Sequence, residues 1–143
     1  MTIRKSPPRH SVDISEEAGV RYLHFGSNWV QGAMRIARPW SLELAYTREM
    51  MAGLLLRGGD WPRSALLIGL GAGSLAKFIY RYLPDCRITV VEINPQVEFI
   101  ARQYFKLPDD PRRLDVVIGG GADYMRGGAR RFDMILVNRK SVV

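Results

Sequence analysis

The pattern of apolar residues changes along the chain, from β-rich runs before Pro39 to a helical period after it. From Val20 the sequence reads VRYLHFGSNWVQGAMRIA, which is two β-rich runs separated by the turn residues GSN. Two such runs around a short polar turn are typical of a hairpin. The pattern therefore predicts a small N-terminal β segment, residues 12–39, which is built around this hairpin and ends at Pro39.

The next segment, SLELAYTREMMAGLLLRGG, has a helical period. Its apolar side chains return every three or four residues, at Leu42, Tyr46, Met50, Leu54 and Leu55. Gly58 and Gly59 follow as a stop signal. We expect one amphipathic helix here, which connects the hairpin to the rest of the fold.

After Trp61 and Pro62, apolar runs alternate with amphipathic stretches. ALLIGL, RITVVEI, LDVVIGG and FDMILVN predict four strands, and a short connector joins the last two. GSLAKFIYRYL predicts a helix, and a second helix begins at Asn94 and Pro95, a good cap and first residue. Apolar runs without polar alternation are typical of parallel strands covered on both faces. The predicted class is α/β, with a partial Rossmann-like domain over residues 40–143.

Composition limits the possible sites and locations. With 143 residues, 47% of them hydrophobic, the chain can form one compact core. Residues 1–11 combine prolines and charges without a period, as a disordered tail does. One cysteine and two histidines are too few for a disulfide or a usual zinc site, so we expect no metal. No apolar stretch suits a signal region or a bilayer span, which predicts a cytoplasmic protein without a membrane partner.

The net charge of +7 raises nucleic acid as a partner. The basic residues are scattered along the chain, however, and the tight pairs at 112–113 and 130–131 lie next to predicted turns. General arginine richness gives the same charge without an organised patch. We therefore do not expect nucleic-acid binding.

A glycine-rich turn lies between the first predicted parallel strand and its helix. The stretch LIGLGAGS places glycine at 69, 71 and 73. Glycines there allow a sharp turn and close approach of a ligand, while the helix N-terminus offers free N–H groups. Because residue 74 is serine, the spacing differs from the G-x-G-x-x-G of dinucleotide binders. Taken alone, the glycines are also compatible with a tight packing turn.

Glu92 ends the second predicted strand, TVVEI. In this fold an acidic side chain at that strand tip lies beside the glycine turn, where its oxygens can accept both hydroxyls of a ribose. A solvated glutamate at a strand end is the alternative interpretation. Together, the turn and Glu92 indicate an adenosine-containing ligand.

From about Val20 to Val137 the chain resembles the polyamine aminopropyltransferase (spermidine synthase) family, especially bacterial spermidine-synthase-like proteins. GVRYLHFGSNWVQGAMR resembles the family's N-terminal β region, LELAYTREMM the segment entering its first helix, and LLIGLGAGSL with VVEINP its nucleoside site. The resemblance implies an S-adenosylmethionine-methyltransferase-like Rossmann fold and a transferase of polyamine biosynthesis. It implies no permanently bound cofactor, but decarboxylated S-adenosylmethionine or S-adenosylmethionine as co-substrate and a polyamine as the other substrate.

The resemblance also implies roles for individual residues. Gly69, Gly71 and Gly73 would contact the ligand, and Glu92 would hold its ribose. Gln31 and Tyr46 would face the substrate cavity, Gln31 toward the adenosyl ligand and Tyr46 toward the acceptor. Without the resemblance, Gln31 is simply a polar hairpin residue and Tyr46 fits the core.

Three positions depart from the family's pattern, and each departure removes a carboxylate. Ala72 replaces an aspartate that attracts the ligand's amine. Gly120 replaces an aspartate that contacts the adenine amine, and Asp123 is displaced from it by three positions. Asn138, at the tip of the fourth strand, replaces the expected catalytic base. Aminopropyl transfer needs an acceptor for the proton of the attacking amine, and an amide is a poor one. We therefore expect little activity from this chain.

Two other functions remain open. An S-adenosylmethionine-dependent methyltransferase would use the same turn and Glu92 without a polyamine pocket. A non-catalytic, C-terminally truncated product would lack the strands that complete the sheet. In the methyltransferase-like order the fourth strand lies beside the first. Residues 134–137 would then form an exposed apolar edge that promotes homo-oligomers or aggregation.

Overall fold

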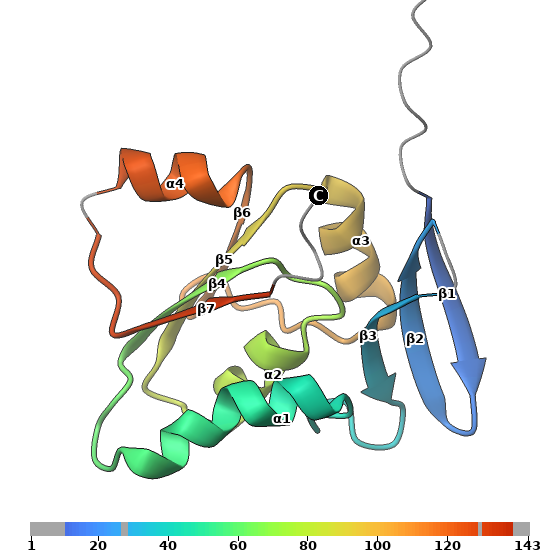
Figure 1. Cartoon of the computed structure of the whole chain (residues 1–143), viewed down its shortest axis with the longest axis horizontal. Coiled ribbons are helices and arrows are strands. Elements are labelled where there is room, and N and C mark those ends of the chain that lie inside the picture. The colour runs from blue at the N-terminus through green and yellow to red at the C-terminus, as the bar shows by residue number, and fades with distance from the viewer. Residues whose placement is uncertain (1–10, 27–28, 129, 139–143) are drawn as a thin grey trace, which may run out of the picture.

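The computed structural model describes residues 11–26, 29–128 and 130–138, which form two sheets (Figure 1). The smaller sheet is antiparallel, in the order β1-β2-β3, with β1 (Val12–Glu17), β2 (Val20–Phe25) and β3 (Val30–Arg35). The larger sheet is parallel, in the order β6-β5-β4-β7, with β4 (Ser64–Ile68), β5 (Arg87–Glu92), β6 (Leu114–Ile118) and β7 (Met134–Val137). The predicted α/β class is confirmed, and so is the place of the fourth parallel strand beside the first.

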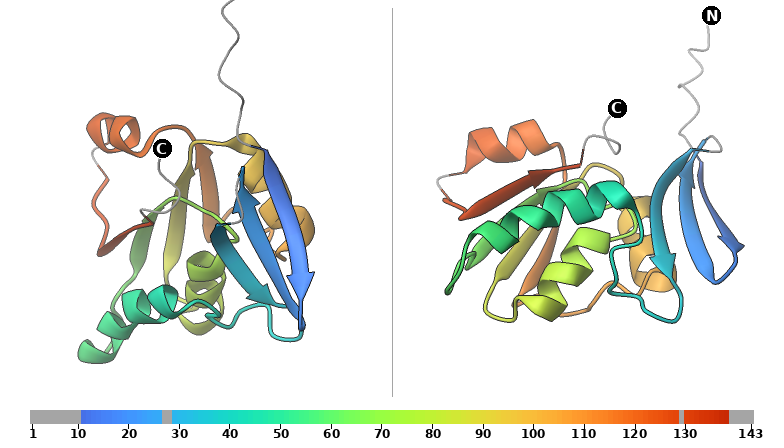
Figure 2. Two further views of the ribbon diagram at one scale, coloured as in Figure 1. Left: turned by 45° about the vertical axis from the view of Figure 1, so that its right-hand side comes forward. Right: turned by 60° about the horizontal axis from the view of Figure 1, so that its bottom comes forward.

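Helices cover both faces of the parallel sheet. They are α1 (Ala45–Ala52), which continues into the 3-10 turn η1 (Gly53–Leu56), then α2 (Ser74–Tyr82), α3 (Pro95–Tyr104) and α4 (Gly121–Gly127). Figures 1 and 2 show α1 and α2 on one face of the sheet and α4 on the other, while α3 lies beside the antiparallel sheet. Helix α3 begins as its sequence predicts, because the side chain of Asn94 accepts a hydrogen bond from the backbone N–H of Gln96 at 3.0 Å.

Two elements correct the sequence-based predictions. The N-terminal region is a three-stranded sheet and not a hairpin alone, since β1 pairs along β2 from Val12 opposite Phe25 to Glu17 opposite Val20. The connector between β6 and β7 contains α4. No residue of α4 is fully buried. Its sequence, GADYMRG, therefore lacks the apolar stripe from which an amphipathic helix is predicted. The tail predicted for residues 1–11 lies outside the described residues, except for Ser11.

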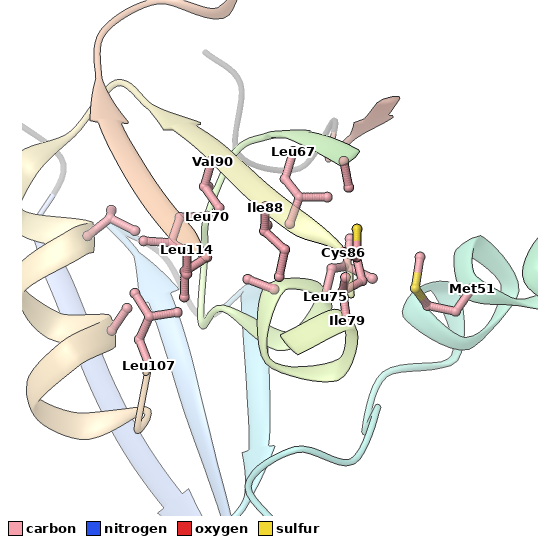
Figure 3. Close-up of a cluster of buried hydrophobic side chains, with 14 residues drawn as sticks. Met51, Leu67, Leu70, Leu75, Ile79, Cys86, Ile88, Val90, Leu107 and Leu114 are labelled. Carbon is pink, nitrogen blue, oxygen red and sulfur yellow. The ribbon is translucent and has the colours of Figure 1, made fainter. Parts of the chain in front are cut away.

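The main core fills the space between the parallel sheet and the helices on one of its faces. Figure 3 shows Ile88 and Val90 of β5 and Ile79 of α2 in this core, with Leu107 on the side of α3. Ile79, Ile88 and Val90 are fully buried. Burial of one such side chain stabilises the fold by about 1.5–3 kcal/mol, so this core holds the parallel strands in place. None of the helices that the structure describes has the length and apolar content that a bilayer crossing requires.

A second cluster docks the antiparallel sheet onto the parallel one. This docking cluster consists of Leu23, Met34, Ala72 and Phe105, with Val12 and Ile14 of β1 packed against it. Ala72 belongs to the loop after β4, and Phe105 follows α3. The antiparallel sheet is therefore fixed at the carboxyl end of the parallel strands, next to the glycine turn (Figure 2).

Candidate functional site

The glycine turn joins β4 to α2 through left-handed backbone. Gly69, Gly71 and Gly73 have φ of 95°, 55° and 72°, which residues with a side chain rarely adopt. The N–H of Gly69 donates to the carbonyl of Val91 at 2.8 Å, so the first residue of the turn is still hydrogen-bonded to β5. Gly73 is the N-cap of α2. The glycines are thus required by the backbone path itself, whatever they also do for a ligand.

Strand β3 lies directly on this turn. A Cβ atom placed on Gly32 would stand 2.6 Å from Cβ of Ala72 and 2.9 Å from its backbone nitrogen. Both distances are too short for non-bonded atoms, so only glycine fits at position 32 unless the backbone moves. Ala72 is only 2% exposed. The hydroxyl of Ser74 donates to the carbonyl of Ala33 at 3.2 Å, which adds a polar tie between the two segments. Gly32 and Ala72 therefore form one close contact between distant parts of the chain.

Glu92 is buried, with 3% exposure, so the alternative of a solvated strand-end glutamate is wrong. Its Oε1 accepts from the N–H of Leu70 at 3.1 Å, and its Oε2 accepts from the N–H of Asn94 at 2.9 Å. The carboxylate thereby ties the glycine turn to the end of β5. Each carboxylate oxygen has a second acceptor position. Glu92 can hold the turn and still accept further hydrogen bonds.

A narrow cleft lies between β3, α1, the glycine turn and the end of β7. It brings together Gln31, Tyr46, Gly69 and Asn138, which the sequence analysis singled out from distant segments, but Gly71, Gly73 and Glu92 do not line it. The volume open to a water-sized sphere is about 10 Å³, the space of about one water molecule. The lining residues are Gln31, Gly32, Tyr46, Thr47, Leu67, Gly69, Leu70, Ala72, Ser74, Leu75, Ala76 and Asn138.

Two polar members of this lining, Thr47 and Ser74, are not among the site residues predicted from the sequence. Thr47 is fully buried one position after Tyr46, and its hydroxyl donates to the carbonyl of Leu44 at 2.5 Å. Ser74 is the residue that makes the spacing of the turn differ from that of dinucleotide binders. Their places follow from how α1 and β3 pack on the turn, and no short motif encodes that packing.

Tyr46 and Asn138 meet inside the cleft. Asn138 is 9% exposed, and its backbone N–H donates to the carbonyl of Ile68 at 2.9 Å, which extends the pairing of β7 with β4. Its side chain is hydrogen-bonded to the hydroxyl of Tyr46. Burial raises the pKa of Tyr46 above its usual value, although the hydrogen bond with Asn138 acts in the opposite direction. Both side chains are therefore neutral near pH 7.

Gln31 presents an unused acceptor. Its Oε1 is buried and has no hydrogen-bond partner among the residues that the structure describes. A buried acceptor without a partner costs about 1–3 kcal/mol. The cleft therefore contains one oxygen atom that a donor from a ligand or a water molecule would stabilise.

Asp123 lies close to Gly120 because the two residues are about one helical turn apart at the start of α4. Gly120 is the N-cap of α4, and a Cβ atom placed on it would stand 3.4 Å from Oδ2 of Asp123. The side chain of Asp123 is 82% exposed and lies 3.7 Å from a guanidinium nitrogen of Arg126. The displacement of this carboxylate by three positions in sequence thus becomes a short distance in space.

Comparisons with known proteins come from sequence and from structure. No family model matches the chain. A polyamine aminopropyltransferase of Neisseria meningitidis is 45% identical over 127 residues, which are 89% of this chain and 48% of the relative. The chain thus spans about half the length of the relatives it matches.

Two solved structures resemble the chain in fold. Spermidine synthase from Thermotoga maritima has a TM-score of 0.68 and 23% identity, over 97% of this chain and 46% of that one. Human methyltransferase-like protein 13, in complex with SAH, has a TM-score of 0.59 and 31% identity, over 66% of this chain and 47% of that one.

Proposed function

Because the chain is related in sequence to the polyamine aminopropyltransferases, over about half of their length, we propose that it binds an adenosyl nucleoside at the carboxyl end of its parallel sheet. In the whole protein this ligand would be decarboxylated S-adenosylmethionine or a close relative, and the pathway would be polyamine biosynthesis. The observation that carries the proposal is the convergence of the glycine turn, Glu92 and the cleft residues at one end of the sheet.

Glu92 is the proposed ribose acceptor. Its two oxygens each hold one backbone N–H and each keep a free acceptor position, which suits a pair of neighbouring hydroxyls. The SAH complex of methyltransferase-like protein 13 supports an adenosyl ligand for this fold. Asp123, beside Gly120, is the proposed acceptor for the adenine amine.

Aminopropyl transfer itself is proposed to be slow in this chain. The acceptor nitrogen would attack the carbon next to the sulfonium, the C–S bond would break to leave a thioether, and the attacking amine would lose a proton. Asn138 and Tyr46 offer a neutral amide and a neutral phenol for that proton. A missing general base typically lowers a rate by about 10² to 10⁴.

Methyl transfer is the second candidate, and the likeness to methyltransferase-like protein 13 favours it. It would use the same nucleoside site and needs no polyamine pocket. Incubation with S-adenosylmethionine and with its decarboxylated form, followed by product chromatography, separates the two activities. A thioether nucleoside formed only from the decarboxylated compound and a polyamine would support aminopropyl transfer.

Isothermal titration calorimetry with adenosine and 5′-methylthioadenosine tests the binding proposal. Glu92→Gln should weaken both ligands by about tenfold or more, since charge-assisted hydrogen bonds contribute about 1.5–3 kcal/mol. Glu49→Gln, an exposed change on α1, is the matched control and should leave the affinity unchanged. If the folded wild-type chain binds neither compound, the proposed function is wrong. An unchanged affinity in Glu92→Gln removes only the ribose assignment.

A further inference from the structure

The cleft is lined without a charged side chain. Of the described residues around it, the polar ones are Gln31, Tyr46, Thr47, Ser74 and Asn138, and the others are apolar or glycine. None of the polar ones is an acid, a lysine, an arginine or a histidine. The nearby carboxylate of Glu92 is outside the lining and holds the N–H groups of Leu70 and Asn94.

A cation entering this cleft would lose water without gaining a counter-charge. Desolvation of an ammonium group costs several kcal/mol unless an opposite charge compensates it. Gln31 offers one acceptor oxygen and the Tyr46 and Asn138 pair offers dipoles, but neither supplies net negative charge. The decarboxylated sulfonium nucleoside carries two cationic centres, so this lining disfavours it twice.

The size of the cleft points in the same direction. The space inside the lining, about 10 Å³, holds a group of roughly the size of a water molecule or a methyl group, so an aminopropyl chain would have to extend out of the cleft or widen it. The close contact of Gly32 with Ala72 limits widening on that side, because β3 would have to leave the turn. Charge and volume are independent observations, and both favour a small, uncharged substituent.

We propose that the cleft selects adenosyl thioethers with a small neutral substituent on sulfur, of the 5′-methylthioadenosine type, over adenosyl compounds with a sulfonium or an amine. This inference rests on the proposed function, since it assumes that the adenosyl ligand directs its sulfur toward Gln31 and Tyr46. The chain would then bind the uncharged nucleoside more tightly than the charged aminopropyl donor. The unused oxygen of Gln31 would accept a hydrogen bond from a water molecule or a hydroxyl group beside the substituent.

Calorimetry with three nucleosides tests the selectivity. Adenosine has no sulfur substituent, 5′-methylthioadenosine has a neutral one, and the matching aminopropyl thioether has an ammonium group at pH 7. We expect 5′-methylthioadenosine to bind at least about tenfold more tightly than the aminopropyl thioether, an energy difference of about 1.4 kcal/mol. Equal or tighter binding of the amine overturns the inference while the proposed function stands. Failure of all three to bind overturns the proposed function itself.

Two variants connect the selectivity to the cleft. Asn138→Asp and Gln31→Glu each place a carboxylate in the lining and should shift the preference toward the aminopropyl thioether by about tenfold. Gln96→Glu adds the same charge on the exposed start of α3 and should leave the preference unchanged. Thermal unfolding of each variant shows that it is folded. If both cleft variants keep the wild-type preference, the ligand's sulfur substituent does not reach the cleft and the inference is wrong.

Discussion

Single residues at the turn show how closely the two sheets depend on each other. Gly32→Ala would place a methyl group 2.6 Å from Cβ of Ala72 and should push β3 off the turn. We expect a loss of about 1–3 kcal/mol in the free energy of unfolding, as for other overpacked sites, together with weaker adenosyl binding. Urea unfolding measures the first effect and calorimetry the second.

Gly53→Ala is the matched control for this change. Gly53 has φ of −58° in a helical turn, and a Cβ atom placed on it would contact nothing within 4 Å. It should be neutral or stabilise the fold by about 0.4–1 kcal/mol. Equal free energies of unfolding for the Gly32→Ala and Gly53→Ala variants would show that β3 can move away from the turn without loss of stability.

Lys77 gives the fold an unusual dependence on pH. It is 4% exposed, and its Nζ donates to the carbonyl of Phe105 at 2.8 Å. Burial, and to a lesser degree the charge of Lys106, lowers the pKa of Lys77 to about 7. The unfolded chain therefore binds more protons than the folded one above that pH, so the contribution of Lys77 to stability rises from about pH 7 toward pH 10.

Lys77→Met should stabilise the protein at pH 6 by about 1 kcal/mol or more, since a pKa change of one unit corresponds to about 1.4 kcal/mol. The gain should shrink as the pH rises from 7 toward 10, because Lys77 is then neutral in the folded chain and its charge is no longer buried. Urea unfolding at pH 6, 8 and 9.5 measures this trend. Lys106→Gln, at an exposed position, is the control and should show a smaller effect. A gain that does not depend on pH would mean that packing, and not charge, limits this site.

At the level of single residues, the sequence predicted which residues belong to the site better than it predicted their hydrogen-bond partners. The glycines at 69, 71 and 73 and the acid at 92 could be found because one turn needs positive φ and one strand ends in a carboxylate. The hydrogen bonds from Leu70 and Asn94 to Glu92 could not be predicted, because they depend on how two loops meet. Gln31 and Asn138, which line the same cleft, could be singled out only through the family resemblance.

Among the secondary-structure elements, α3 is the one whose start the sequence describes best. Asn94→Ala removes the side-chain acceptor for the N–H of Gln96 and should lower the free energy of unfolding by about 1 kcal/mol. Asn94→Ser keeps a capping oxygen and should recover most of that loss. Thermal or urea unfolding measures both. If the alanine variant matches the wild type, Pro95 and the backbone alone define the start of the helix.

The elements that pattern analysis missed are those with little apolar contrast. Strand β1, VDISEE, buries only Val12 and Ile14 in part, and its register is set by pairing with β2. Helix α4 has no fully buried residue. The parallel strands were predictable because their long apolar runs need cover on both faces.

For the whole molecule, self-association remains the main prediction. Within the described residues β7 pairs only with β4, and Ile135 and Val137 are about half exposed. A groove of about 300 Å³ lies beside this strand, lined by apolar side chains that include Tyr124, Met125 and Phe132 and also by Arg130 and Arg131. An apolar strand with an unpaired edge recruits other chains. Light scattering after size exclusion should show a mass that increases with concentration.

A charge at this edge should oppose the association. Ile135→Lys is expected to reduce the concentration dependence, because a lysine on an edge strand disfavours pairing with another chain. Leu55→Lys, at an exposed apolar position on η1, is the matched control and should leave the association unchanged. A stable wild-type monomer at all concentrations would contradict the prediction.

The close approach of Gly32 to Ala72 also has an evolutionary consequence. Because the two positions share one space, a substitution at either changes what the other tolerates, so their effects should be epistatic and not additive. An aspartate introduced at position 72 alone would enter a site that β3 already covers. A lineage that gained a charged ligand site through this position would first have to accumulate changes that lift β3, and the order of those steps would decide whether the intermediate chains fold.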